Sequence, residues 1–108
     1  QRCFTAEEQA KAARRKGANE PASTLAKRFA AKEACAKALG TGFNRGVTLK
    51  SIGVINTQSG APTLELTGGA QKRLQSLTPT GKKLRIHVTL GDEYPYAKAL
   101  VIIESTDE

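Results

Sequence analysis

The pattern of apolar and polar residues predicts one long helix in the first half of the chain. Ala and Leu dominate residues 25–39, hydroxyl residues stand at the start, and Gly40 follows the end. Ser23 or Thr24 can cap this helix because a side-chain oxygen accepts hydrogen bonds from the free N–H groups of the first turn. Gly40 can adopt the left-handed conformation that commonly ends a helix. We therefore expect the other elements to pack around a helix that begins at Ser23 or Thr24.

Helical periodicity gives this helix an apolar face. At about 100° per residue, four side chains lie within about 40° of Leu25: Phe29, Lys32, Ala36 and Leu39. Lys32 belongs with the apolar residues because its long aliphatic stem can lie along an apolar surface. This face is predicted to pack against the core.

A second ridge of the helix carries Glu33 and Lys37 one turn apart, beside the small side chains of Ala26 and Ala30. Spacing alone allows two interpretations. The two are either an exposed pair that stabilises the helix by about 0.3–0.5 kcal/mol, or a binding site that a ligand can approach closely. Arg28 lies about 140° around the helix from Glu33, so one helix cannot direct both at the same atom.

Turn residues and alternation predict the other elements. Thr5 and Glu8 have the spacing of a capping box that opens a first helix over 9–16, and residues 17–21 separate it from the long helix. Downstream we expect a strand over 47–56, a hairpin loop over 57–62, a strand over 63–66, and a helix over 70–77 with Leu74 and Leu77 inward. Strands over 84–90 and 97–104 follow, with a turn at 91–93. The order predicts an α+β fold, a single domain of residues 1–108 with an antiparallel sheet packed with the long central helix.

Two features next to these elements are candidates for chemistry. Gly40 and Gly42 open a glycine-punctuated loop whose N–H groups can approach a phosphate, although its spacing matches no known phosphate-binding loop. Strict alternation over 84–90 places His87 on the polar face of its strand. A histidine there is either an ordinary surface residue or part of a site, and the pattern does not decide between them.

Composition narrows the classes of function. The net charge is +7, and residues 1–50 carry all of it while residues 51–108 are neutral. The basic half is predicted to face an anion, but three Phe, two Tyr and no Trp are few for stacking nucleic-acid bases. Without an 18-residue apolar run or a signal-peptide pattern, we expect a soluble, cytoplasmic protein. Cys3 and Cys35 are expected to be reduced, and with one His they cannot form a structural zinc site.

The sequence around the charged ridge resembles a known family. Arg28-Phe29-Ala30-Ala31-Lys32-Glu33-Ala34 followed by Lys37-Ala38-Leu39-Gly40-Thr41-Gly42 is similar to the signature of holo-acyl-carrier-protein synthases, in the 4′-phosphopantetheinyl transferase superfamily. Three further runs agree in order and spacing: Phe4-Thr5-Ala6-Glu7-Glu8, then Val54-Ile55-Asn56 with Gly60-Ala61-Pro62, and His87-Val88-Thr89-Leu90. The resemblance covers essentially the whole chain and is greatest to alphaproteobacterial members.

The resemblance implies a Mg²⁺-dependent transfer of 4′-phosphopantetheine from coenzyme A to a serine of apo-acyl carrier protein, in fatty acid biosynthesis. It implies that Glu33 binds the metal, that Lys37 reaches the phosphates, and that Arg28 and His87 line the coenzyme site, with Gly40 and Gly42 beside it. Glu33, Lys37 and His87 are then the candidate catalytic residues. The family also implies a homotrimer with sites between subunits, and partners that include neither nucleic acid nor membrane.

The sequence departs from the family pattern in one respect, and two other functions stay open as alternatives. Members of the family begin with an apolar strand whose Asp is a second metal ligand, and the 108 residues do not contain that strand. We expect either a longer natural chain or a protein that lacks the strand, so an inactive interaction domain stays an alternative. A small basic nucleic-acid-binding module is the other. The acidic carrier protein is predicted to dock on Arg14, Arg15 and Lys16. The alternative is that these three residues form a solvated helix end.

Overall fold

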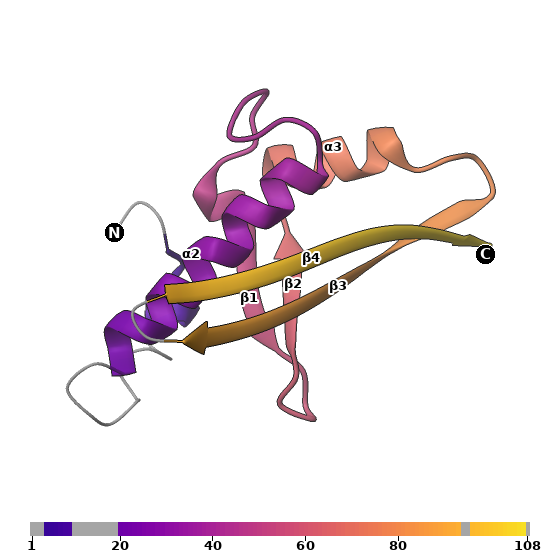
Figure 1. Cartoon of the computed structure of the whole chain (residues 1–108). Coiled ribbons are helices and arrows are strands. Elements are labelled where there is room, and N and C mark those ends of the chain that lie inside the picture. Colours follow the sequence, from indigo (N-terminus) through magenta and orange to yellow (C-terminus); the bar gives the residue numbers. More distant parts are fainter. Residues whose placement is uncertain (1–3, 10–19, 94–95, 108) are drawn as a thin grey trace.

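The structure is a computed structural model that describes residues 4–9, 20–93 and 96–107. Its elements, after a helical turn over residues 6–9, are α2 (Glu20–Ala38), η1 (Leu49–Ser51), β1 (Ile52–Asn56), β2 (Pro62–Leu66), α3 (Gly68–Leu77), β3 (Lys82–Glu93) and β4 (Tyr96–Asp107). The two pairs of strands form two antiparallel hairpins, β1–β2 and β3–β4. α2 contacts both hairpins and crosses the middle of the molecule (Figure 1). The predicted α+β fold with a long central helix is therefore confirmed, with the strands in two separate two-stranded sheets.

The long helix begins earlier than predicted and ends as predicted. α2 starts at Glu20 and not at Ser23 or Thr24. Pro21 belongs to the segment 17–21 that the sequence predicts between the helices, but it lies in the first turn of α2, where a proline costs little because its missing N–H would have no partner there. At the other end Gly40 has φ +78°, and Gly42 N donates to Ala36 O at 3.1 Å, so glycines close the helix.

The short hairpin holds a correction at its start. The predicted strand over 47–56 begins only at Ile52, because residues 49–51 form the 3₁₀ helix η1. Thr48 and Ser51 form a capping box in which each side chain accepts from the other's backbone N–H. These local side-chain bonds compete with strand pairing. β1 then pairs with β2 from Ile52↔Leu66 to Asn56↔Pro62.

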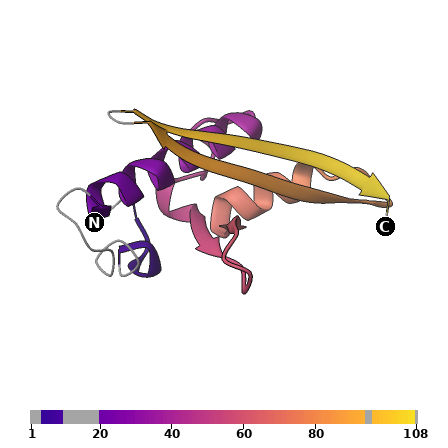
Figure 2. The same cartoon turned by 60° about the horizontal axis from the view of Figure 1, so that its bottom comes forward.

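The long hairpin is longer than predicted at both ends. β3 and β4 pair in unbroken register from Lys82↔Asp107 to Glu93↔Tyr96. The turn expected at residues 91–93 is wrong, since Gly91 and its neighbours continue β3 and pair with β4. In Figure 2 this hairpin runs as a long ribbon across α2, with α3 and the short hairpin below it.

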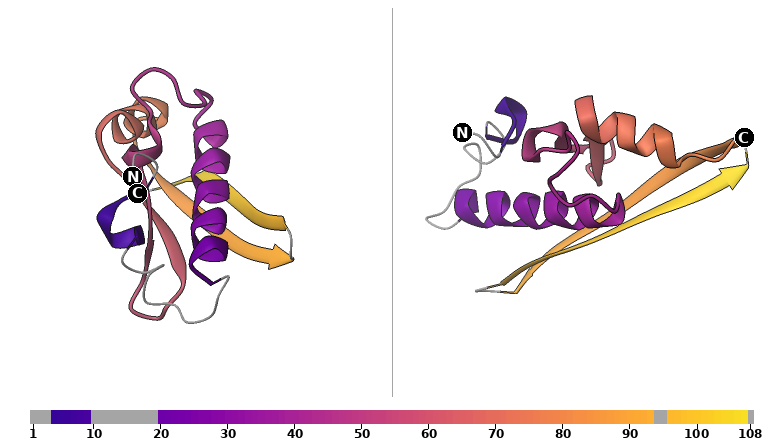
Figure 3. Two further views of the ribbon diagram at one scale, coloured as in Figure 1. Left: turned by 90° about the vertical axis from the view of Figure 1, so that its left-hand side faces the viewer. Right: turned by 90° about the horizontal axis from the view of Figure 1, so that it is seen from above.

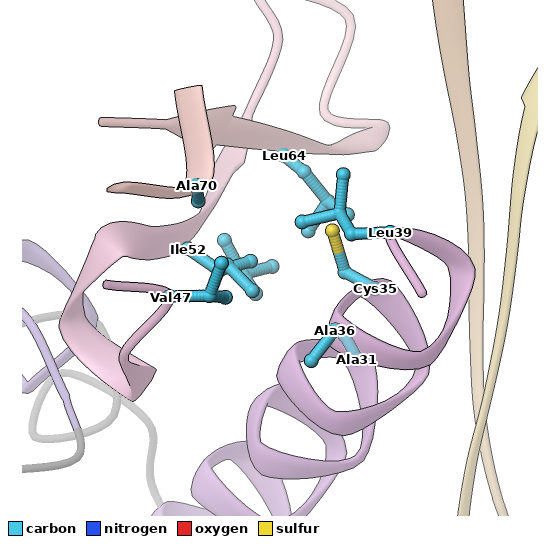
Figure 4. Close-up of a cluster of buried hydrophobic side chains, with 9 residues drawn as sticks. Ala31, Cys35, Ala36, Leu39, Val47, Ile52, Leu64 and Ala70 are labelled. Carbon is cyan, nitrogen blue, oxygen red and sulfur yellow. The ribbon is translucent and has the colours of Figure 1, made fainter. Parts of the chain in front are cut away.

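The core lies between α2 and the short hairpin with its neighbours. Nine buried residues form one cluster, and Figure 4 shows side chains from α2 facing Val47, Ile52, Leu64 and Ala70. Burying side chains the size of Leu or Ile contributes about 1.5–3 kcal/mol each. Leu74 of α3 packs against this cluster, whereas Leu77, also predicted to point inward, is 40% exposed.

Alternation gives the long hairpin two different faces. Side chains of its inner face pack against the core cluster: Ile86, Val88, Leu90, Ala99, Val101 and Ile103. Its outer face is exposed and includes Arg85, His87, Thr89, Leu100, Ile102 and Glu104. In the view from above, α2 lies alongside part of this hairpin, with η1 and α3 on the other side of α2 (Figure 3). Among the described residues, no helix is both long enough and apolar enough to cross a membrane.

Candidate functional site

Glu33 and Lys37 occupy the ridge of α2 that the sequence assigned to them. Both side chains are exposed. Among the described residues no salt bridge joins them, so the structure does not show the simple ion pair that their spacing allows. The carboxylate and the ammonium group are thus open to a ligand along one ridge, one helical turn apart.

Lys32, the residue before Glu33, has its ammonium group in the core. Its side chain is 0% exposed, and Nζ lies 2.9 Å from Oε1 of Glu8, which is also 0% exposed. Nζ donates to the carbonyl oxygens of Leu49 and Ile52, both at 2.7 Å. Sequence reasoning placed the stem of Lys32 correctly but missed the buried charge pair.

Glu8 joins the N-terminal segment to β1. The predicted capping box is confirmed, because Thr5 N donates to Glu8 Oε1 and Glu8 N donates to Thr5 Oγ1. Oε2 of Glu8 also accepts from Val54 N at 2.5 Å. One carboxylate therefore connects the helical turn at residues 6–9 to β1 and, through Lys32, to α2. A lysine inside an apolar stripe was the only sequence signal for this connection.

Arg28 lies one turn before Lys32 and is also buried, at 3% exposure. Its Nη2 donates to Asn56 Oδ1 at 3.3 Å. The structure thus brings Arg28 to the end of β1 and not to Glu33, as the angle between them on the helix requires.

The loop over residues 40–46 is held against the end of α2 and the start of α3. Arg73 of α3 donates through Nε to Leu39 O at 2.9 Å and so satisfies a carbonyl at the end of the helix. A Cβ on Gly69 would lie 2.0 Å from Gly46 O, so only glycine permits this approach. Sequence reasoning singled out Gly40 and Gly42 but missed Arg73 and Gly69, which contact the chain at the two ends of this loop, at Leu39 and Gly46.

His87 is on the outer face of the long hairpin, as alternation predicts. Its side chain is 54% exposed, and Nε2 lies 2.8 Å from Glu104 Oε1. Because the inner face of the same hairpin packs toward α2, His87 points away from Glu33. Within one chain the structure does not bring these two candidate catalytic residues together.

A magnesium ion fits this site only if the substrate provides ligands. Glu33 offers an exposed carboxylate, the hard oxygen donor that Mg²⁺ prefers. In the described part of the chain, no three His, Cys, Asp or Glu side chains group closely enough to hold a metal. One carboxylate completed by phosphate oxygens and water is nevertheless a common arrangement for Mg²⁺.

Two further expectations have different outcomes. Cys35 is a free, buried cysteine, as expected. Burial raises the pKa of its thiol to about 11, which keeps it protonated and unreactive at neutral pH. Cys3 and the predicted docking residues Arg14, Arg15 and Lys16 lie outside the described residues.

Comparison with known proteins places this arrangement in a family. The family model of the 4′-phosphopantetheinyl transferase superfamily matches residues 1–99. The holo-[acyl-carrier-protein] synthase of Sphingopyxis alaskensis is 60% identical over 104 residues, which are 96% of this chain and 77% of that protein.

Solved structures of holo-[acyl-carrier-protein] synthases have a fold similar to that of this chain. The crystal structure of a holo-[acyl-carrier-protein] synthase from Neisseria meningitidis has a TM-score of 0.77 and 34% identity, covering 95% of this chain and 77% of that one. A holo-(acyl-carrier-protein) synthase from Bacillus anthracis, solved in complex with CoA (3′,5′-ADP), has a TM-score of 0.72 and 31% identity, covering 98% of this chain and 79% of that one. On these grounds the chain belongs to the 4′-phosphopantetheinyl transferase superfamily.

Proposed function

We propose that the protein is a holo-acyl-carrier-protein synthase, which transfers 4′-phosphopantetheine from coenzyme A to a serine of apo-acyl carrier protein. The observation that carries this function is the exposed Glu33 and Lys37 ridge, set in the motif that the family shares. The named relatives and the Bacillus anthracis structure with coenzyme A support the substrates. Fatty acid biosynthesis and a cytoplasmic location are parts of the same proposal.

The transfer needs positive charge beside a pyrophosphate and a route for one proton. The serine oxygen bonds to the β-phosphorus of coenzyme A, and the bond from that phosphorus to the bridging oxygen breaks. 3′,5′-ADP leaves with the bridging oxygen, and the serine proton passes to a base. Lys37 is exposed and one turn from Glu33, so it can neutralise phosphate oxygens on the same ridge.

Glu33 is the proposed metal ligand of this chain. When bound there, Mg²⁺ would supply charge neutralisation for the pyrophosphate. Gly40 and Gly42 begin the loop that follows Lys37, and their exposed or half-exposed backbone is proposed to lie beside the coenzyme. Arg28 is proposed to serve coenzyme binding from the face of α2 that meets β1.

We propose a homotrimer in which His87 acts on the coenzyme bound by a neighbouring copy. His87 faces away from Glu33 of its own chain, so it can reach such a site only across an interface. Leu100 and Ile102 share its exposed face at 59% and 50% exposure, which supports contact with another copy. Neutral His87 can then accept a proton, or charged His87 can neutralise phosphate.

The acidic carrier protein is the proposed macromolecular partner. Residues 1–50 carry the net charge of +7 and would speed its association by electrostatic steering. Arg14, Arg15 and Lys16 are proposed as its docking residues from this charge distribution alone.

A direct binding experiment tests the function. Coenzyme A and a random oligonucleotide are titrated into the protein with Mg²⁺ and with EDTA. We expect coenzyme A to bind more tightly and only its binding to require Mg²⁺. Tighter oligonucleotide binding that ignores EDTA would favour the nucleic-acid alternative. The protein is also incubated with coenzyme A, Mg²⁺ and apo-acyl carrier protein, and the mass of the carrier protein is measured. If coenzyme A binds but this mass does not increase, the inactive interaction domain is favoured.

A further inference from the structure

The backbone N–H groups that directly follow α2 are already engaged in hydrogen bonds. Gly40 N donates to Lys37 O at 2.9 Å. Thr41 N and Gly42 N both donate to Ala36 O, at 3.4 and 3.1 Å. These bonds close the end of the helix, whereas in a phosphate-binding loop the corresponding groups point at the anion. An anion that binds beside these glycines therefore depends on donors from side chains.

The end of α2 is also the unfavourable pole of the helix for an anion. Carbonyl oxygens point out of the last turn, and the helix dipole places about half a negative charge there. Lys37 is the basic residue in this last turn. One exposed lysine beside a negative pole is a weak site for a pyrophosphate, which carries two negative charges. A second cation at this point would make the site much stronger.

Arg73 of α3 places a cation at the end of α2. Its Nε donates to Leu39 O at 2.9 Å, which fixes the half-buried side chain there. A Cβ built on Gly40 would lie 3.4 Å from Nη2 of Arg73, so Nη2 lies beside Gly40. The bond to Leu39 uses one of the five N–H donors of a guanidinium group, and among the described residues no partner is found for the other four.

We propose that Arg73 is a further coenzyme-binding residue, whose Nη groups bind the pyrophosphate of coenzyme A together with Lys37. This inference rests on the proposed function. A guanidinium group that is held through Nε presents its two Nη atoms as a planar fork, which matches two oxygens of a phosphate. Its charge also offsets the negative pole of α2. Capping of the helix accounts for the bond to Leu39 O, but not for the donors that stay open beside Gly40.

The salt dependence of coenzyme binding separates this role from capping. Arg73→Gln removes the charge, and Lys72→Gln removes a charge from the adjacent, exposed position of α3 as a matched control. The Kd of coenzyme A is measured with constant Mg²⁺ at ionic strengths of about 0.01 M and about 1 M, between which the Debye length falls from about 30 Å to about 3 Å. We expect Arg73→Gln to weaken binding on the order of 10-fold at low salt and much less at high salt. Lys72→Gln should have little effect at either.

Two further measurements locate the contact on the coenzyme. Dephospho-coenzyme A lacks the 3′-phosphate and keeps the pyrophosphate, so Arg73→Gln should weaken its binding by the same factor. Lys37→Gln and the double variant with Arg73→Gln complete a double-mutant cycle. Because both cations bind one pyrophosphate, the loss in the double variant should differ from the sum of the two single losses.

One result would reduce Arg73 to a helix cap. If Arg73→Gln lowers the midpoint of unfolding and weakens coenzyme binding by the same factor at both ionic strengths, the residue acts through the structure of the helix end and the inference is overturned. Unchanged binding at low salt overturns it as well. Arg73→Lys replaces Arg73→Gln if the latter does not fold, and should still weaken binding because an ammonium group lacks the planar fork.

The remaining outcomes concern the group that Arg73 binds. A loss that disappears with dephospho-coenzyme A would assign Arg73 to the 3′-phosphate and overturn the assignment to the pyrophosphate. Strictly additive losses in the cycle with Lys37 would also contradict a shared pyrophosphate. Absence of Mg²⁺-dependent coenzyme binding in the wild type would instead contradict the proposed function, so the two failures are distinguishable.

Discussion

Two neighbouring lysines of α2, Lys32 and Lys37, are each combined with a glutamate, and the two combinations have opposite environments. Lys32 and its partner Glu8 are both 0% exposed and 2.9 Å apart, with further bonds to the backbone at both groups. Glu33 and Lys37 are exposed on another face, and no salt bridge between them is found among the described residues. The same residue types thus stabilise the fold on one face and stay available to a ligand on the next.

The difference follows from what surrounds each charge. A buried ammonium group is tolerated only with close partners, and Lys32 has one carboxylate and two carbonyl oxygens. An exposed pair gains little from pairing because water screens it. Glu33 can therefore exchange water for a cation at little cost to stability. Lys32, next to it in sequence, keeps α2 in the orientation that exposes Glu33.

The largest effect is expected from removing the buried ammonium group. Lys32→Met leaves the Glu8 carboxylate buried without its cation and two carbonyl oxygens without a donor. We expect the free energy of unfolding to fall by about 3–5 kcal/mol, measured by urea denaturation. Lys37→Met makes the same change on the same helix at an exposed position and should change stability by less than about 0.5 kcal/mol. Equal losses in the two variants would contradict the comparison.

A second substitution, at the Glu8 carboxylate that pairs with Lys32, tests the cause of this loss of stability. Adding Glu8→Gln to Lys32→Met removes the uncompensated charge, and the double variant should recover part of the stability that Lys32→Met lost. If the double variant instead loses the sum of what Lys32→Met and Glu8→Gln lose singly in free energy of unfolding, Glu8 acts mainly through its bonds to Thr5 and Val54.

The next largest effect concerns the exposed carboxylate. Glu33→Gln keeps the shape of the side chain and removes its charge, so we expect activity to fall by about 10²-fold or more while the midpoint of unfolding stays unchanged. The rate of holo-carrier-protein formation, measured across a Mg²⁺ titration, checks this. Glu65→Gln, at an exposed position of β2, is the matched control and should keep full activity. Full activity and unaltered Mg²⁺ dependence in Glu33→Gln would reduce Glu33 to a surface residue.

A smaller effect tests whether packing holds the loop that follows Lys37. Gly69→Ala would place a methyl group 2.0 Å from Gly46 O, and the loop 40–46 has to move. Overpacking of this kind costs about 1–3 kcal/mol, and we expect a higher KM for coenzyme A in addition. Gly91→Ala adds the same methyl group into open space and should change neither quantity. A KM that stays normal in Gly69→Ala would show that the position of this loop does not matter to the coenzyme.

The sequence predicts best those features of the fold whose physical cause lies in residues close together along the chain. The existence of α2 and its end at Gly40 follow from helix propensity and from glycine's access to positive φ. Alternation placed His87 correctly on the face away from the core. The same local reasoning misplaced the start of α2, because Pro21 breaks a helix interior but is compatible with a first turn.

The features that the sequence did not predict depend on contacts between residues far apart along the chain. Glu8 and Lys32 meet only because the first helical turn packs against α2 and β1, and no local pattern predicts a carboxylate at that point. Arg28 and Asn56 are separated in the same way. For the site, spacing on α2 gave the Glu33 and Lys37 ridge, whereas only the folded hairpin shows that His87 points away from it.

The smallest effect concerns Cys35, which is buried on α2 beside apolar residues of the core cluster (Figure 4). Lys32, on the same helix, has charged and polar partners instead. Burial disfavours the thiolate, so the pKa of this thiol rises from an ordinary value of 9.0 to about 11. Its contribution to stability is complete below about pH 9 and is lost as the pH rises toward about 11, because the unfolded chain releases the proton first. Cys35→Ala cannot titrate, so the stability difference between wild type and variant should shrink across this pH range, whereas lysines and tyrosines affect both proteins equally. Parallel alkaline unfolding of the two proteins would mean that Cys35 is not held as the neutral thiol, and that burial on this face of α2 does not control ionisation as the comparison requires.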